Sequence, residues 1–145
     1  MKKAMKWAIA VLIAIQLVPY GHTHSNPPVT QEPPWDSPET RELARRACFD
    51  CHSNQTVWPW YSTIAPVSWL NQRDVNDGRG HVNFSEWNQP QKHAEDVANE
   101  VRSGDMPLWF YLPMHPAARL TDADKQAFIE GAGKSFGPQK EPKQK

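Results

Sequence analysis

Two cysteines and a histidine stand close together in the chain and form the pattern C-x-x-C-H, as Cys48, Cys51 and His52. In this pattern each thiol adds across one vinyl group of a haem, and the histidine that follows ligates the iron from the proximal side. Because the cysteines are three residues apart, one helical turn can present both sulfur atoms to the same porphyrin edge. The motif therefore predicts one covalently attached haem c, with its iron bound to His52.

Other chemistries of paired cysteines fit this sequence less well and are kept as minor alternatives. A thioredoxin-like dithiol belongs in a βαβ setting, and no stretch alternates apolar and polar residues as a strand would. A structural zinc site takes about four Cys or His ligands, usually as paired knuckles, and the chain has only two cysteines. A disulfide between Cys48 and Cys51 would close a very small loop and so stabilise the fold little.

A low-spin haem in an electron carrier also needs a sixth iron ligand, and one methionine has suitable neighbours. Met106 lies in G-D-M-P at 104–107, where the glycine ends a helix and the proline stiffens the backbone. A thioether opposite histidine favours Fe(II) and raises the reduction potential. We therefore predict Met106 as the sixth ligand, with Met114 as the alternative. His81 and His115 are further candidates, because imidazole also binds haem iron.

Aromatic residues are dense shortly after the motif, in W-P-W-Y at 58–61. The proline prevents a regular helix through this point. Indole N–H and phenol O–H groups are suitable hydrogen-bond donors to haem propionates. We therefore expect Trp58, Trp60 and Tyr61 to form a wall of the haem pocket. An ordinary aromatic cluster without contact to the cofactor is the alternative.

The composition fits a small haem domain. The chain has 145 residues, a formal net charge of 0, 14 prolines and 7 tryptophans. The neutral charge does not indicate nucleic acid as a partner. The low aliphatic content leaves a small core, which a buried porphyrin would complete. No paired carboxylates and no Ser-His-Asp pattern indicate a hydrolase, so the sequence favours a carrier over an enzyme.

The first 24 residues have the features of a targeting segment. Lys2, Lys3 and Lys6 precede an apolar run from Trp7 to Val18. This run is shorter than the ~20 residues of a membrane span and fits the apolar region of a signal peptide. No clear small-residue cleavage site follows, so a cleaved signal peptide and an uncleaved anchor both remain open. Either would place the domain in the periplasm, and an anchor would hold it at the inner membrane.

The patterning divides the chain into four segments. These are the signal peptide or anchor (1–24), a Pro-rich linker (25–36), the haem domain (37–134) and a disordered tail (135–145). Apolar spacing and capping residues predict a small all-α domain of about four helices, which the motif would wrap around one haem. The expected helices run from Ser37 to about Asp50, from Pro66 to Asp77 before Gly78, from Pro90 to Ser103, and from Thr121 to Gly131 and Gly133.

The stretch from Cys48 to about Ile129 resembles the bacterial haem-binding domain family of exported, c-type cytochrome-like proteins. The resemblance is carried by C-F-D-C-H-S-N-Q-T-V-W-P-W-Y at 48–61, I-A-P-V-S-W-L at 64–70, H-V-N-F-S-E-W at 81–87, G-D-M-P at 104–107 and M-H-P-A-A-R-L-T at 114–121. It implies covalent haem on Cys48 and Cys51, His52 as the proximal ligand and an all-helical cytochrome-c-like fold.

These observations predict an exported monohaem protein that transfers single electrons to and from redox partner proteins. The alternative is a haem peroxidase-like enzyme, or a gas or redox sensor, with an open sixth iron position. His81 or His115 would then act as the distal group. A haem-bearing structural module of a larger complex is a third interpretation.

Overall fold

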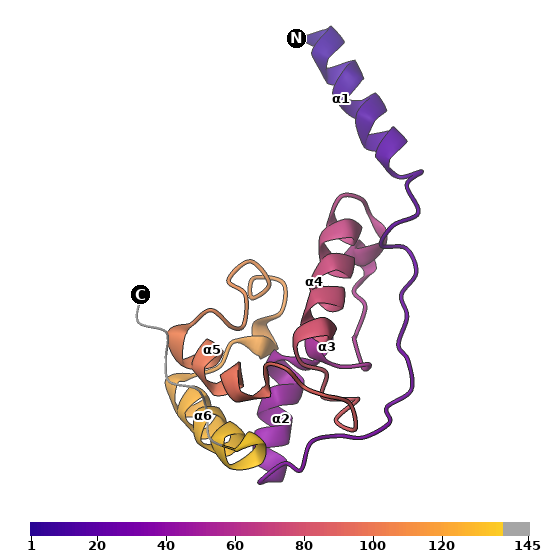
Figure 1. Cartoon of the computed structure of the whole chain (residues 1–145). Coiled ribbons are helices and arrows are strands. Elements are labelled where there is room, and N and C mark those ends of the chain that lie inside the picture. Colours follow the sequence, from indigo (N-terminus) through magenta and orange to yellow (C-terminus); the bar gives the residue numbers. More distant parts are fainter. Residues whose placement is uncertain (138–145) are drawn as a thin grey trace.

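The structure is a computed structural model, in which residues 1–137 are described (Figure 1). Its helices are α1 (Lys2–Ile15), α2 (Pro38–Ala47), α3 (Phe49–His52), α4 (Val67–His81), α5 (Val97–Ser103) and α6 (Asp122–Phe136). Short 3-10 turns lie at Trp60–Thr63, Ala94–Asp96 and Pro116–Ala118. Within residues 1–137 β-type pairing is limited to one isolated bridge, between Gln31 and Glu86. The prediction of a helical fold is confirmed.

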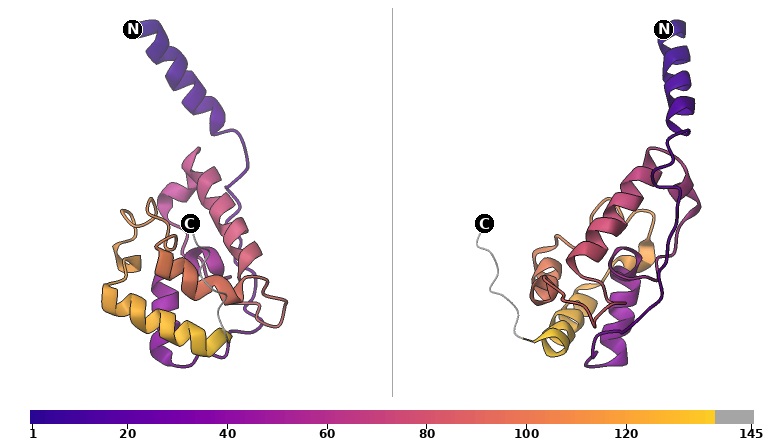
Figure 2. Two further views of the ribbon diagram at one scale, coloured as in Figure 1. Left: turned by 60° about the vertical axis from the view of Figure 1, so that its left-hand side comes forward. Right: turned by 45° about the vertical axis from the view of Figure 1, so that its right-hand side comes forward.

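The hydrophobic core lies where α2, α5 and α6 pack together in the lower part of the domain (Figure 2). Phe84 is fully buried there and its ring is surrounded by other rings. The ring centroids within 5.3–6.3 Å of it belong to Trp35, Phe49, His52, Trp87 and Phe136. The aromatic core therefore reaches the histidine of the C-x-x-C-H motif.

The helix before the motif begins as expected and ends earlier. Ser37 accepts a hydrogen bond from the Thr40 N–H (3.1 Å), and Pro38 occupies the first turn. The helix was expected to reach Asp50, but the backbone departs from helical geometry at Cys48 (φ −127°), which separates α2 from the short α3. The separate turn buries Phe49 to 2% exposure against Phe84.

Three glycines that were expected to end helices lie inside them instead, and those predictions were wrong. α4 passes through Gly78 to His81, and α6 passes through Gly131 and Gly133 to Phe136. A Cβ at Gly78 would overlap the carbonyl of Cys51, and a Cβ at Gly131 would overlap the Thr40 side chain, whereas a Cβ at Gly133 would meet nothing within 4 Å. Gly78 and Gly131 therefore allow a helix to approach a neighbouring segment closely, which outweighs the low helix propensity of glycine.

The remaining helices agree with the sequence at their capped ends. α5 ends at Gly104, which has a left-handed backbone (φ +80°), but α5 begins only at Val97 rather than at Pro90. Thr121 begins α6 with a capping box that includes Asp124. Of the expected C-terminal tail, residues 138–145 lie outside the described residues.

The N-terminal segment consists of an exposed helix and a strap. α1 projects away from the domain (Figure 1), and none of its residues is buried. No helix in the described part of the chain is both long and apolar enough to cross a membrane. The strap, residues 22–36, then runs in extended form along the domain, where Thr30 N–H donates to the Ser85 carbonyl (2.9 Å) and Trp87 N–H donates to the Gln31 carbonyl (2.9 Å).

The contact at Gly78 leads to a stability prediction. Gly78→Ala should lower the free energy of unfolding by about 1–3 kcal/mol, because the added methyl group forces α4 away from the Cys51 carbonyl. Gly80→Ala in the same helix is the control, since a Cβ there meets nothing within 4 Å. It should leave stability unchanged or raise it by about 0.5–1 kcal/mol. Denaturant unfolding followed by circular dichroism measures both, and equal effects would contradict the close-approach explanation.

Candidate functional site

A cavity of about 450 Å³ lies between α3, α4, α5 and the segment after α5. Cys48, Cys51 and His52 line it, and Met106 lines it as well. Its apolar wall consists of Ala47, Val82, Phe84, Val97, Val101, Pro107 and Leu108. The structure thus brings the three motif residues and the expected sixth ligand to one largely apolar space. We call this space the motif cavity.

His52 is held in one orientation by the chain. Its Nδ1 lies 3.1 Å from the carbonyl oxygen of Val82, and its own carbonyl accepts a hydrogen bond from Phe84 N–H (2.8 Å). Burial lowers the pKa of the imidazole, so the ring is neutral at neutral pH. A neutral ring that donates from Nδ1 keeps the lone pair of Nε2 for a metal, as metal-bound histidines do.

The two thiols are free and protonated. Burial raises the pKa of both Cys48 and Cys51 to about 12, and a neighbouring acidic group raises each further, Cys51 for Cys48 and Asp74 for Cys51. Reduced thiols are the form that can add to a vinyl group. In the part of the chain that the structure describes, no three His, Cys, Asp or Glu side chains are placed to hold a metal ion together.

The two candidate methionines are placed differently. Met106 is partly buried against the hydrophobic core, and its N–H donates to the Glu100 carbonyl (3.0 Å), which holds the backbone just after α5. Met114 is 59% exposed and lines a second cavity instead. On placement alone, Met106 is the methionine that shares a cavity with His52.

The second cavity, of about 340 Å³, is lined by Trp58, Trp60 and Tyr61 together with Met114 and His115. It adjoins the motif cavity, because the four residues Asp50, Cys51, Asp74 and Tyr111 line both. The W-P-W-Y residues therefore lie beside Cys51 but do not line the cavity of His52. We call this space the aromatic cavity.

The polar groups of Trp58 and Tyr61 already have partners within the chain. Trp58 Nε1 donates to Asn26 Oδ1 (3.2 Å), and its ring stacks on His24 with centroids 4.5 Å apart. His115 Nδ1 donates to the Tyr111 carbonyl (3.0 Å), which leaves Nε2 to accept from the Tyr61 hydroxyl (3.1 Å). Trp60 is 74% exposed.

The sequence analysis did not identify Tyr111 and Asp50, which lie between the two cavities. Tyr111 Oη donates to Asp50 Oδ2 (2.6 Å), and Val57 N–H donates to Asp50 Oδ1 (3.0 Å). The Tyr111 ring also stacks on His115 with centroids 3.7 Å apart. Burial raises the pKa of Tyr111, and the hydrogen bond to Asp50 raises it further. Asp50 lies inside the motif, but its partner is 61 residues away and no local pattern indicates it.

Arg79 was also missed, and it shapes the turn after the motif. Its guanidinium donates to the Ser53 carbonyl (2.8 Å), to Thr56 Oγ1 (3.0 Å) and to Asn26 Oδ1 (3.0 Å). One side chain on α4 therefore connects the strap with the segment that follows His52. Arg79 lies in the last turn of the polar helix α4, and no sequence pattern there indicates that it binds these distant groups.

Carboxylates dominate the charged lining of the motif cavity: Asp50, Asp74, Asp77, Asp96 and Glu100. Burial raises the pKa of Asp74. The cationisable lining residues besides His52 are His81 and His93, whose ring centroids are 5.0 Å apart. His81 Nδ1 lies 2.7 Å from the Asp77 carbonyl. The cavity therefore favours a positively charged centre, and its two histidines are the sites that would attract anionic groups.

The Tyr111–Asp50 hydrogen bond leads to a prediction about pH. Tyr111→Phe should lower the free energy of unfolding at pH 7 by about 1–3 kcal/mol, because Asp50 loses a donor in a partly buried place. Folding raises the pKa of Tyr111 above its unfolded value of about 10. The protonated hydroxyl therefore contributes fully to the free energy of unfolding below about pH 10, and this contribution is lost as the pH rises further. The variant should therefore lose less stability than wild type between about pH 9 and 11. Parallel denaturant titrations measure this difference, and identical slopes would contradict the assignment.

The comparisons with known proteins agree with this cavity. Residues 10–134 match the family described as the haem-binding domain. No curated protein matches the chain. No solved structure matches it either. Because the family match spans most of the sequence, this helical chain belongs to the haem-binding domain family, and haem is its ligand.

Proposed function

We propose that this chain is an exported monohaem c-type cytochrome that transfers single electrons between redox partner proteins. One observation carries the proposal: Cys48, Cys51, His52 and Met106 line a single cavity. When bound, the haem supplies one-electron cycling of its iron between Fe(III) and Fe(II). The chain's own residues attach the group, ligate the iron and keep water away.

Attachment falls to the two thiols. Cys48 and Cys51 would hold the haem through thioether bonds to its two vinyl groups, with each thiol supplying both the sulfur and the proton that the addition needs. Cys48 and Cys51 are reduced and protonated, as this addition requires. This addition uses no oxidant. Because the periplasm favours disulfides, the two cysteines must stay reduced there until the haem is attached.

Ligation falls to His52 and Met106. The hydrogen bond from Nδ1 to the Val82 carbonyl fixes the imidazole so that Nε2 is the metal ligand. Met106 supplies the thioether from the segment after α5, whose backbone is held by Glu100. Met114 is the alternative ligand, but it lines the aromatic cavity. Trp58, Trp60 and Tyr61 are assigned to the haem edge at Cys51, where the two cavities adjoin.

Export is assigned to the N-terminal segment, which we infer stays on the mature protein as a tether to the inner membrane. Lys2, Lys3 and Lys6 precede the apolar α1, as in signal peptides and signal anchors. The Gln16 side chain donates to the Ala65 carbonyl and accepts from the Ala65 N–H, both at 2.9 Å. Residues that a peptidase would remove are thus part of the contacts of the domain.

A second function has one observation in its favour. His81 lines the motif cavity, and its Nδ1 bonds to its own helix, which leaves Nε2 available. A haem enzyme of peroxidase type, or a gas or redox sensor, would use such a distal imidazole at an open sixth position. A high-spin ferric spectrum and fast binding of carbon monoxide would establish this function in place of electron transfer.

The deciding test for the carrier is the optical spectrum of protein from cells that mature c-type cytochromes. Covalent haem should remain with the polypeptide after acid–acetone extraction, and the oxidised protein should show the weak red methionine–iron band. Met106→Ala should abolish that band because it removes the sulfur ligand. Met114→Ala is the matched control and should leave it unchanged. Extractable haem would refute thioether attachment, and loss of the band in Met114→Ala alone would assign ligation to Met114.

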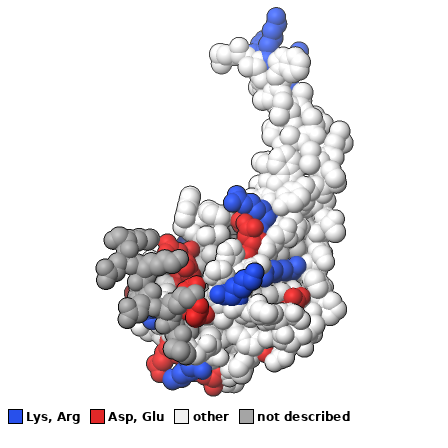
Figure 3. All heavy atoms as spheres, viewed as in Figure 1, with Lys and Arg blue, Asp and Glu red and all other residues white. Residues whose placement is uncertain are grey.

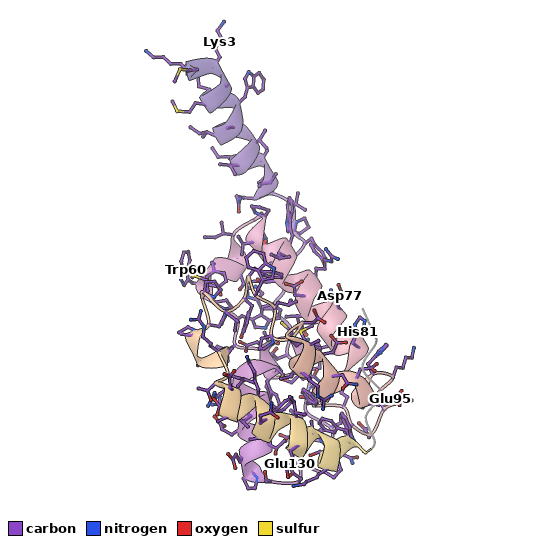
Figure 4. All side chains as sticks on the ribbon, turned by 90° about the vertical axis from the view of Figure 1, so that its left-hand side faces the viewer. Lys3, Trp60, Asp77, His81, Glu95 and Glu130 are labelled. Atoms are coloured by element: carbon purple, nitrogen blue, oxygen red, sulfur yellow. The ribbon has the colours of Figure 1, made fainter. Side chains whose placement is uncertain are left out.

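The acidic lining leads to a prediction about the reduction potential. Asp74→Asn should raise the midpoint potential by an amount on the order of tens of millivolts, because removing a negative charge near the iron disfavours Fe(III). Glu130→Gln, at the opposite end of the domain in Figure 4, is the control and should leave the potential unchanged. Spectroelectrochemical titration measures all three proteins. Equal potentials would place Asp74 outside the electrostatic range of the iron.

A further inference from the structure

One end of the domain exposes a group of large apolar side chains. The exposed apolar residues at this end are Val57, Trp60, Ile64, Val67, Leu70, Trp109, Phe110 and Met114. The two indoles are the most exposed aromatic groups of the domain, at 74% for Trp60 and 81% for Trp109. Contiguous exposed apolar surface of this kind marks an interaction site in soluble domains. We call this surface the apolar end.

These residues form one surface although they come from two separate segments. Trp60, Val67, Leu70, Phe110 and Met114 all line the aromatic cavity and so surround one opening. The remaining members adjoin this rim. The Ile64 carbonyl accepts from the Ser68 N–H (2.9 Å) at the start of α4, and Trp109 packs edge to face on Phe110 with centroids 5.8 Å apart.

The side chains of the apolar end are themselves uncharged, although Asp50 and Asp74 line the cavity that they surround. The sequence contains no Lys, Arg, Asp or Glu between residues 51 and 72 or between residues 106 and 118. In Figure 3 the tip of α1 is charged, the rest of α1 and the uppermost part of the domain are uncharged on this face, and charged side chains appear farther down the domain. Figure 4 places Trp60 toward α1, whereas Glu130 lies at the far end of the domain. A protein partner bound through salt bridges does not suit such a surface.

The apolar helix α1 leaves the domain at this same end (Figure 1). The paired hydrogen bonds between Gln16 and Ala65 attach the end of α1 next to Ile64. Gly21 packs on the backbone of Ser68 so closely that a Cβ would overlap it. Residues 7–31 contain no charged side chain, and the residues of α1 are solvent-exposed for most of its length. The helix and the apolar end are therefore continuous.

We propose that the apolar end rests on the surface of a lipid bilayer, beside α1 buried in the lipid. Indole rings favour the boundary between headgroups and acyl chains, because one part of the ring is apolar and the N–H is polar. Binding through this end is hydrophobic, so it is insensitive to salt and to anionic lipid. The aromatic cavity then opens toward the membrane. This inference rests on the proposed retention of α1 and not on the identity of the iron ligands.

The test uses the full-length, haem-loaded protein and sedimentation with neutral phosphatidylcholine vesicles. The variant Ile64→Ser/Trp109→Ser removes two members of the apolar end that line neither cavity. It should bind vesicles about tenfold more weakly than wild type, because two large side chains no longer enter the interface. The matched control is Val29→Ser, an exposed apolar residue on the strap, which should bind as wild type does. High salt should not alter the difference.

Two outcomes would overturn the proposal. One is equal vesicle binding by wild type and Ile64→Ser/Trp109→Ser. The other is a wild-type dimer that this variant dissociates without any change in vesicle affinity, which would make the apolar end a self-association surface. The haem spectrum of each variant is recorded in parallel and reports separately on the proposed electron-transfer function. A normal spectrum with unchanged vesicle binding would refute the docking surface alone.

Discussion

The structure depends on the close approach of α4 to the turn that carries the C-x-x-C-H motif. Gly78 makes this approach possible, because any side chain there would overlap the Cys51 carbonyl. With α4 in this position, Val82 at its end offers a carbonyl to His52, and Arg79 one turn earlier binds the carbonyl of Ser53. One backbone contact therefore aligns the thiols, orients the imidazole and shapes the segment that leads to the aromatic cavity.

The motif cavity combines opposing electrostatic influences. Burial keeps His52 and both thiols neutral, and the apolar wall excludes water. If Met106 ligates the iron as proposed, its thioether would favour Fe(II), whereas the carboxylates that line the same cavity would favour Fe(III). Burial raises the pKa of Asp74, a carboxylate that lines both cavities. Under the proposed function, the balance of these groups would set the potential of the haem.

The domain is polarised from one end to the other. The aromatic core of Phe84 and its neighbours stabilises the lower half, where α2, α5 and α6 meet. The upper half has fewer buried aliphatic side chains and instead exposes aromatic ones around the second cavity. A strap of N-terminal residues connects the two halves through hydrogen bonds to Thr56 and Ser85. This asymmetry is the basis for the proposal that the upper end rests on a lipid surface.

Much of the local structure follows from the sequence alone. The motif, the cap at Ser37, the glycine stop at Gly104 and the capping box at Thr121 all depend on residues within a few positions of one another, and the structure has each helix end where these signals predict it. The haem-binding family was recognisable for the same reason, since its motifs are contiguous.

The tertiary structure decided what depends on distant contacts. Gly78 and Gly131 look like helix stops in sequence, yet they lie in helices because neighbouring segments press against them. The Val82 carbonyl, the Tyr111–Asp50 bond and the reach of Arg79 involve backbone atoms or pairs far apart in the chain, which no local pattern reports. Likewise the separation of W-P-W-Y into a cavity of its own is set by the 106–118 segment that covers it. Sequence patterns thus determined the chemistry and the helix ends, and packing determined which groups surround that chemistry, because close contact depends on shape in three dimensions.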